Sequence, residues 1–547
     1  MGASESQPWI ALVGPEEEEN LALRYLASSL AAAGFRSEIV GFNGADQLPL
    51  VLDQILSAPL TPLLTALSLS FQLRAKDFLA LAVALRQRGY RGHITAGGHF
   101  GTFACRELLQ DFPELDSIVR HEAEETLVRL ALAVADAGGL GAIPGLAYRD
   151  TGDRVVLTQH PTPPALDALP WPDRRGTPPS YLGHRISPMV GSRGCYGACS
   201  FCCIAAWHRE ASPHERFRLR PAQDVAHEMA WLQREKGVEV FIFHDDNFFL
   251  PTKAATMERI GALGDALERR GLNPFATVVK ARPNDLDEEV LSAMRERLGL
   301  IRLFLGVESD AGRGLATLAR GVRSEENHRA LGLLERLDIF PCFNLLIFDP
   351  STTLEDLETN LRFMERFAEI PMNFGRVKLY AGTPLLARMQ AEGRCRGDYL
   401  EWDYSLGDES VQRIFEIAMD CFYPRNFSGE ATPHRLMGTR FLVELARRFH
   451  GEVVEEPWLA RAKQVARNLT EDSVKALREI LDFVRQRSVQ REERETFTRE
   501  LSLRLREAEG RINEKADALE AEIQAAVLRG RGGDHEEGEG RNEANGR

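Results

Sequence analysis

Residues 191–203 read Gly-Ser-Arg-Gly-Cys-Tyr-Gly-Ala-Cys-Ser-Phe-Cys-Cys. Cys195, Cys199 and Cys202 follow a C-x3-C-x2-C spacing, and Phe201 stands immediately before the third cysteine. An iron–sulfur cube normally takes four cysteine thiolates, so a set of three leaves one iron without a protein ligand. An open position on a metal centre indicates chemistry rather than a purely structural role.

A zinc site is one alternative, because His208 is near enough in sequence to complete a Cys3His set. Zinc sites more often use paired C-x2-C units or mixed cysteine and histidine sets, and this spacing suits neither pattern. Gly194 and Gly197 favour a loop that wraps closely around a cluster, since glycine tolerates positive φ. Buried free thiols without a metal are the other alternative.

Length and composition limit the class of protein. A chain of 547 residues is too long for one core, so two or three domains are expected. The net charge of −14 argues against a broad nucleic-acid or anionic-membrane surface. The N-terminal residues lack the basic and apolar regions of a signal peptide, and no run approaches the roughly 18 apolar residues of a spanning helix. Eight cysteines, three of them clustered, suit a reducing compartment, and we expect a cytoplasmic protein with no nucleic-acid or membrane partner.

Short apolar runs alternate with helical patterns over residues 1–150, which predicts a parallel, doubly wound, Rossmann-like sheet. The expected strands are Trp9–Gly14, Ser37–Phe42, Leu63–Ser70, His93–Gly97 and Leu115–Val119. Ligands on such sheets bind at the carboxyl ends of the strands, where Ser70, Gly97 and Gly98 stand. No G-x-G-x-x-G follows the first strand, so a dinucleotide site is not expected. A flavodoxin-like scaffold without a cofactor remains an alternative.

Residues 151–185 are rich in proline and predict an extended linker. Residues 186–400 predict six βα units, and therefore an open, partial TIM-type barrel. Its strands are expected near residues 187–190, 238–244, 274–280, 300–307, 340–348 and 374–379. Polar residues gather where these strands end, as in other βα barrels.

The rest of the chain carries fewer signals. Residues 401–529 predict a mostly helical domain, with helices at 432–450, 459–468 and 472–486. A spaced series from Leu505 to Ala526 predicts a helix packed on its own domain, with a short coiled coil as the alternative. Residues 530–547 are poor in hydrophobic residues, which predicts a disordered tail.

The cysteine spacing with its aromatic residue, together with the order of the segments, resembles the cobalamin-binding radical S-adenosylmethionine (SAM) enzymes over most of residues 1–400. The resemblance implies a 4Fe–4S cluster on Cys195, Cys199 and Cys202, SAM bound at the open iron, and cobalamin in the N-terminal domain. Ser70 and Gly97–Gly98 stand where this family places a serine and a Gly-Gly beside the nucleotide tail of cobalamin. The D-x-H-x-x-G motif is absent, as is usual in the family.

The resemblance also implies roles for residues of the barrel. Asp245, after the second strand, would hold the SAM ammonium. Glu308 and Ser309 match a Gly-Val-Glu-Ser pattern that meets the ribose or the methionine carboxylate of SAM. Arg282 and Arg320 could pair with that carboxylate, since a guanidinium suits a planar anion. Each of these residues could instead be a helix cap or part of an ordinary ion pair.

The resemblance implies a methyltransferase that acts on an unactivated carbon through a 5′-deoxyadenosyl radical and methylcobalamin. The substrate would be a small molecule or a peptide, and an electron donor such as flavodoxin or ferredoxin would be needed. One alternative keeps the cofactors but cyclises or rearranges the substrate without methyl transfer. Another is a non-catalytic cobalamin- or metal-binding regulator.

Overall fold

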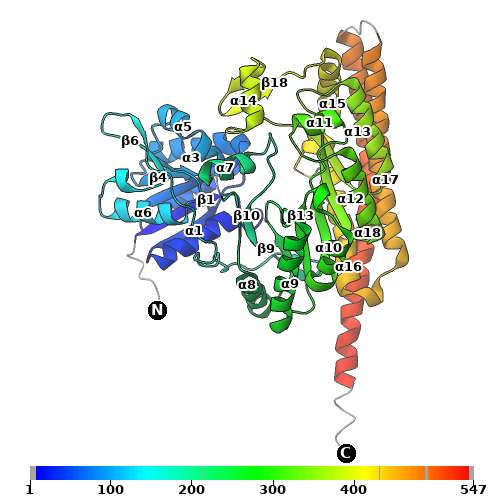
Figure 1. Ribbon diagram of the computed structural model, residues 1–547, viewed down its shortest axis with the longest axis horizontal. Coiled ribbons are helices and arrows are strands. Elements are labelled where there is room, and N and C mark those ends of the chain that lie inside the picture. Colours follow the sequence, from blue (N-terminus) through cyan, green and yellow to red (C-terminus); the bar gives the residue numbers. More distant parts are fainter. Residues whose placement is uncertain (1–7, 213–214, 430, 487–490, 541–547) are drawn as a thin grey trace, which may run out of the picture. The chain divides into compact units, whose positions relative to one another are not determined.

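The computed structural model describes residues 8–212, 215–429, 431–486 and 491–540, with side chains up to residue 530. The chain divides into two compact units (Figure 1). Unit 1 comprises Met1–Pro178, Pro188–Glu228 and Lys378–Tyr404. Unit 2 comprises Pro179–Ser187, Met229–Val377 and Ser405–Arg547. The cysteine loop therefore belongs to the unit that contains the N-terminal α/β layer.

The sheet of unit 1 has seven strands in the order β2-β1-β3-β4-β5-β6-β7. The strands are β1 (Trp9–Gly14), β2 (Arg36–Gly41), β3 (Leu64–Ser68), β4 (His93–Gly97), β5 (Ser117–Val119), β6 (Leu146–Arg149) and β7 (Val155–Leu157). The first five pair in parallel, which confirms the five predicted strands. β6 and β7 add an antiparallel hairpin, so the sheet continues past residue 150, the expected end of the first domain.

Helices cover both faces of this sheet because its side chains alternate (Figure 1). Ala11 and Val13 of β1 join a core with α2 (Leu48–Leu56), α3 (Ala75–Gln87), α4 (His99–Phe103) and α5 (Cys105–Asp111). Ile10 and Leu12 join the opposite core, with α1 (Leu21–Ala32) and α6 (Glu124–Ala135). The doubly wound fold expected from the sequence is therefore present.

The remaining elements of unit 1 come from later parts of the chain. They are β10 (Ser192–Gly194), α7 (Cys203–Ala211), β11 (Phe217–Leu219), the start of α8 (Ala222–Lys236), α14 (Pro384–Ala391), β17 (Cys395–Asp398) and β18 (Glu401–Tyr404). A buried arginine of the proline-rich linker, Arg174, ties them to the N-terminal layer. Its guanidinium contacts Glu19 and Glu228 at 2.7 Å each.

Unit 2 is built on a second seven-stranded sheet, in the order β16-β15-β14-β13-β12-β9-β8. Its strands are β8 (Ser180–Tyr181), β9 (His184–Met189), β12 (Val238–Phe243), β13 (Ala276–Ala281), β14 (Leu300–Leu305), β15 (Phe340–Phe348) and β16 (Met372–Arg376). The six predicted barrel strands correspond to β9 and β12 to β16. The helices between them are α9 (Lys253–Arg269), α10 (Glu288–Leu298), α11 (Gly312–Thr317), α12 (Ser324–Arg336) and α13 (Leu354–Arg366). The sheet forms the open half-barrel that six units predict.

Four long helices complete unit 2 and run beside one another (Figure 1). They are α15 (Glu409–Phe427), α16 (Thr432–Phe449), α17 (Glu456–Arg485) and α18 (Arg491–Gly540). Within the described part of the chain, no helix combines the length and the apolar character that crossing a membrane requires. Leu519 and Ile523 of α18 pack into a core with α16 and α17, so this helix packs on its own domain as expected.

Three expectations for this region need correction. The helices predicted at 459–468 and 472–486 are one helix, α17, because Leu469 and Thr470 between them are buried and no glycine or proline interrupts the pattern. Helix α15 was not expected; Pro424 lies inside it near its end. The tail expected to be disordered from residue 530 is helical to Gly540, where α18 extends past its last buried turn, and residues 541–547 lie outside the described residues.

Candidate active site

The loop that carries the three cysteines begins at a tight backbone contact. β10 pairs with β11 in an antiparallel ribbon in which Gly194 faces Phe217. Gly194 has φ of 90°, and a Cβ at this position would lie 1.9 Å from the carbonyl oxygen of Arg216. Only glycine fits here, because both its conformation and its distance from the neighbouring backbone exclude a side chain. The chain is thereby turned into the loop that starts at Cys195.

The three cysteines lie on this one loop, and none of them forms a disulfide. The amide of Gly197 donates to Cys195 Sγ at 3.3 Å. Cys202 is the N-cap of α7, and its Sγ accepts the amide of Ala205 at 3.5 Å. Cys199 is buried. Amide donors and a helix N-terminus stabilise the thiolates that a cluster requires, so the loop fits an iron–sulfur cluster.

Ion pairs fasten the cysteine loop to the N-terminal α/β layer. Arg193 of β10 contacts Glu122 and Glu124, after β5, at 2.7 Å and 2.6 Å. Arg218 of β11 pairs with Glu122 as well. Burial opposes ionisation of Glu124, but Arg193 outweighs it and holds the pKa of that carboxyl below its usual range. The sequence showed the two glutamates at a strand end, but nothing in it pointed to their arginine partners.

Ser70, Gly97 and Gly98 come together at the carboxyl edge of the first sheet, as predicted. Gly98 has φ of 100°, and a Cβ there would lie 2.6 Å from Ser70 Oγ. The amide of Leu69 donates to the carbonyl of Gly97 at 2.7 Å, which holds the two strand ends together. The edge lies beside the change of direction in strand order between β1 and β3, where open α/β sheets bind ligands. This edge, with two glycines and the small side chain of Ser70, fits the nucleotide tail of cobalamin.

In unit 2, three of the predicted charged residues gather where β13 and β14 end. Glu308 has φ of 63°, a conformation uncommon for a residue with a side chain. Burial raises the pKa of its carboxyl, while Arg320 and Arg282 act in the opposite direction. Arg282 donates to the carbonyl of Arg320, so the two arginines are linked. A strained acidic residue between two cations is typical of a binding site rather than of a helix cap.

The other two predicted residues of unit 2 are engaged by the protein itself. Asp245 is buried and pairs with Arg259 at 2.8 Å, an arginine that also stacks on Phe248. Ser309 is buried, and its hydroxyl donates to Asn360 Oδ1 at 3.2 Å. Their partners lie far away in sequence, and no motif pointed to them. The roles of Asp245 and Ser309 toward SAM stay predictions.

Family models match two stretches of the chain. A B12 binding domain matches residues 10–131, which is the sheet that carries Ser70, Gly97 and Gly98. A radical SAM superfamily model matches residues 189–364, from the cysteine loop through most of the half-barrel. The second match favours the cluster over the zinc alternative.

Relatives of known sequence and structure agree with these two domains. An uncharacterized methyltransferase of Pyrococcus horikoshii is 25% identical over 302 residues, which cover 53% of this chain and 62% of that protein. An anaerobic magnesium-protoporphyrin IX monomethyl ester cyclase of Cereibacter sphaeroides is 30% identical over 309 residues, 54% of this chain and 48% of that one. The chain thus spans about half to three fifths of these curated relatives.

A solved structure extends the similarity to the fold of almost the whole chain. The cobalamin-dependent SAM radical enzyme OxsB, with aqua-cobalamin and SAM bound, aligns with a TM-score of 0.63. The alignment covers 98% of this chain and 81% of that one at 17% identity. This likeness concerns the fold alone. The two family-model matches place the chain among the radical SAM enzymes that carry a B12-binding domain.

Proposed function

We propose that this chain is a cobalamin-dependent radical SAM methyltransferase that acts on an unactivated carbon of a small molecule or peptide. Bound together, the 4Fe–4S cluster, SAM and cobalamin supply reductive cleavage of a sulfonium and a transferable methyl group. The protein's part is to hold these groups, to position them and to exclude water. An external electron donor, such as flavodoxin or ferredoxin, would supply the reducing electron.

Each candidate residue has a defined task in this proposal. Cys195, Cys199 and Cys202 hold the cluster and leave one iron open for the amine and carboxylate of SAM. Ser70, Gly97 and Gly98 receive the nucleotide tail of cobalamin at the edge of the first sheet. No residue of the chain has to supply a base near the reacting carbon, because hydrogen abstraction is performed by the cofactors.

In unit 2 the tasks concern SAM alone. Glu308 would accept hydrogen bonds from the SAM ribose or ammonium, and Arg282 and Arg320 would balance its charge or pair with the methionine carboxylate. Asp245 would face the SAM ammonium, in competition with its partner Arg259.

The observation that carries the proposal is the fastening of the cysteine loop to the B12-binding layer. Arg193 lies two residues before the first cysteine, and it is held by two carboxylates that follow β5 of that layer. Buried ion pairs of this kind contribute to a defined geometry, because an unpaired partner would be costly. The chain therefore brings its two cofactor-binding parts together within one compact unit.

A second function is favoured by one comparison. The 30% identity with the magnesium-protoporphyrin monomethyl ester cyclase would suit an enzyme that uses the same cofactors to close a ring without methyl transfer. The two functions differ in their products. A methyltransferase forms S-adenosylhomocysteine together with 5′-deoxyadenosine, whereas the cyclase reaction forms no S-adenosylhomocysteine.

The experiment is anaerobic reconstitution with iron, sulfide and hydroxocobalamin, followed by incubation with SAM and a strong reductant. Iron, sulfide and corrinoid content are measured first, and the nucleoside products are then quantified by mass spectrometry. We expect one cluster and one corrinoid per chain and slow formation of 5′-deoxyadenosine even without substrate. Formation of S-adenosylhomocysteine supports methyl transfer. An intact cluster that yields no 5′-deoxyadenosine would contradict radical chemistry.

A further inference from the structure

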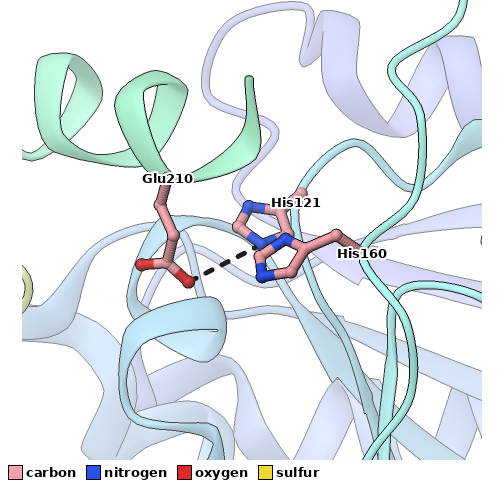
Figure 2. A group of neighbouring side chains, drawn as sticks. All are labelled: His121, His160 and Glu210. Atoms are coloured by element: carbon pink, nitrogen blue, oxygen red, sulfur yellow. Dashed lines mark ion pairs between the residues drawn. The ribbon is translucent and has the colours of Figure 1, made fainter. Parts of the chain in front are cut away.

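Two histidines and a glutamate from three separate segments of unit 1 converge on one point (Figure 2). His121 follows β5, His160 lies in the extended segment after β7, and Glu210 is in the last turn of α7. One ligand atom from each lies within 4.8 Å of the others. His121 Nε2 lies 3.7 Å from Glu210 Oε1. This donor set is not part of the cysteine loop or of the sheet edge that we assign to cobalamin.

His121 is buried without a partner for its ring. Its side chain is 1% exposed, and among the described residues neither ring nitrogen has a hydrogen-bond partner. Leaving a buried polar group without a hydrogen bond costs free energy, so His121 calls for a bound ligand or water. Burial lowers the pKa of His121 to about 3, and the imidazole is therefore neutral and can offer a lone pair.

The backbone holds His121 in this place despite strain. Its φ is 63°, in the left-handed region that favours glycine. The amide of His121 donates to Thr102 Oγ1 at 2.9 Å, and the indole of Trp207 donates to the same oxygen at 3.1 Å. A side chain kept in a strained, dry position is consistent with a specific task.

We propose that His121, His160 and Glu210 bind one divalent transition-metal ion, with Zn²⁺ as the probe. Two imidazoles and one carboxylate form a donor set that suits zinc and iron(II). Three protein ligands leave a coordination position open for water or for a small ligand. The ion would join α7, the helix that follows the cysteine loop, to the turn after β5 and to the segment that contains His160.

The geometry needs only a small adjustment to bind the ion. Zinc bonds of about 2.1 Å in a tetrahedral site place ligand atoms about 3.4 Å apart. The rings of His121 and His160 are tilted by 34° with centroids 4.9 Å apart, and both His160 and Glu210 are exposed. Rotation of these two exposed side chains can close the remaining gap, while the buried His121 stays fixed.

The positive charge of Arg120 opposes the binding of a cation between His121, His160 and Glu210. Its Nη2 lies 3.3 Å from His160 Nε2 and 3.8 Å from Glu210 Oε1. The positive charge lowers the affinity for any metal, and its contact with His160 has to give way when the metal binds. Its Nη1 contacts the Thr158 carbonyl at 3.5 Å, so the guanidinium keeps a partner in the metal-bound form.

The test is zinc binding by the full chain after its cluster has been reconstituted, so that the three cysteines are occupied. After treatment with a chelating resin, zinc is titrated anaerobically by calorimetry and counted per chain by elemental analysis. We expect one zinc per chain. His160→Gln and Glu210→Gln should each raise the dissociation constant by more than about tenfold, because each removes a direct ligand. Both positions are exposed, so neither change should prevent folding.

Two controls separate this site from other zinc-binding groups. Glu125→Gln removes an exposed carboxylate from α6 and should leave zinc binding unchanged. A full-length variant with Cys195, Cys199 and Cys202 all replaced by serine should still bind one zinc. Hydrogen exchange of the α7 peptide should slow on adding zinc to the wild type, but not to Glu210→Gln. No zinc binding, binding that survives both ligand substitutions, or binding lost in the serine variant would overturn the proposal.

Discussion

The cysteine loop of unit 1 and the strand ends of the half-barrel in unit 2 both carry residues that the sequence singled out. In the loop, the three cysteines lie within one short segment, and the amides of Gly197 and of Ala205 in α7 donate to two of the sulfurs. At the strand ends, Asp245 and Ser309 are occupied by Arg259 and Asn360. Of the three predicted acidic and hydroxyl residues there, Glu308 is the one whose carboxyl interacts with the predicted arginines, Arg282 and Arg320.

The difference follows from the distance along the chain that each site spans. Ligands within one short loop are placed by local backbone geometry, which sequence spacing and glycine positions record. Residues at the ends of strands acquire their partners from helices that are remote in sequence. A local motif such as the cysteine loop therefore predicts a site more securely than polar residues at strand ends do. Substitutions in the two regions test this contrast.

The largest effect is expected from Arg193→Gln. This change leaves Glu122 and Glu124 buried without one of their cationic partners, which should cost about 3–5 kcal/mol of unfolding free energy in unit 1. Hydrogen exchange of peptides covering residues 192–211 measures the loss. The control is Arg129→Gln, which breaks an exposed pair with Glu125 and should cost less than about 0.5 kcal/mol. Equal exchange in both variants would show that the loop does not depend on this anchor.

Next comes Gly194→Ala, which places a Cβ against the backbone carbonyl of Arg216. We expect a loss of about 2–4 kcal/mol and a marked fall in bound iron after reconstitution. Gly89→Ala is a matched control, because Gly89 has φ of 88° but no atom within 4 Å of an added Cβ. It should cost about 1–2 kcal/mol and leave the iron content unchanged. A full complement of iron in Gly194→Ala would mean that the ribbon does not set the loop.

Acid should weaken unit 1 through His99, which packs against Trp207 with ring centroids 5.0 Å apart. Burial lowers the pKa of His99 to about 4, whereas the unfolded chain has a value near 6.5. At pH values between these two pKa values, His99 binds a proton in the unfolded state but not in the folded state. Stability is therefore full above pH 6.5 and falls as the pH drops toward 4, by no more than about 3 kcal/mol.

The matched variant for this pH effect is His99→Gln, which has no titrating group. Urea unfolding of unit 1, followed by segment-resolved hydrogen exchange at several pH values, should give a flatter profile for the variant than for the wild type. Parallel profiles would assign the acid sensitivity to other groups.

The smallest effects separate Glu308 from Ser309. Glu308→Gln should weaken SAM binding to the reconstituted protein roughly tenfold, because hydrogen bonds to a charged acceptor become neutral ones. Ser309→Ala should change SAM affinity by no more than about twofold. It should lower the free energy of unfolding by about 1 kcal/mol, because the Ser309 hydroxyl donates a hydrogen bond to Asn360. Glu296→Gln, on the exposed side of α10, is the control. The reverse order of affinities would mean that Ser309, and not Glu308, contacts SAM.

Most of the fold could be predicted because its strands are short, apolar and separated by helical patterns. All five parallel strands of the first sheet and all six of the half-barrel fall within a few residues of their expected places. The errors lie in the C-terminal helices. There the sequence offers no breaker near Leu469, and α15, which contains Pro424 near its end, was not expected.

Prediction of the candidate site was limited by side-chain partners rather than by the fold. The sequence indicated the cysteines and the glycines of the sheet edge because their chemistry requires those residue types. It gave no indication that Arg193 pairs with Glu122 and Glu124, since ion pairs between remote segments leave no spacing pattern. Likewise, the convergence of His121 with His160 and Glu210 leaves no spacing pattern in the sequence, because the three residues come from separate segments.

The central claim is that three thiolates hold a cluster with one open iron, and Cys203, a neighbouring cysteine outside that set, allows a direct comparison with Cys199. Cys199→Ala and Cys203→Ser are reconstituted anaerobically with the wild type, and iron content and 5′-deoxyadenosine formed from SAM under reduction are measured. We predict that Cys203→Ser keeps the cluster and cleaves SAM, whereas Cys199→Ala loses both properties. A brown Cys199→Ala protein that still cleaves SAM reductively would contradict the account.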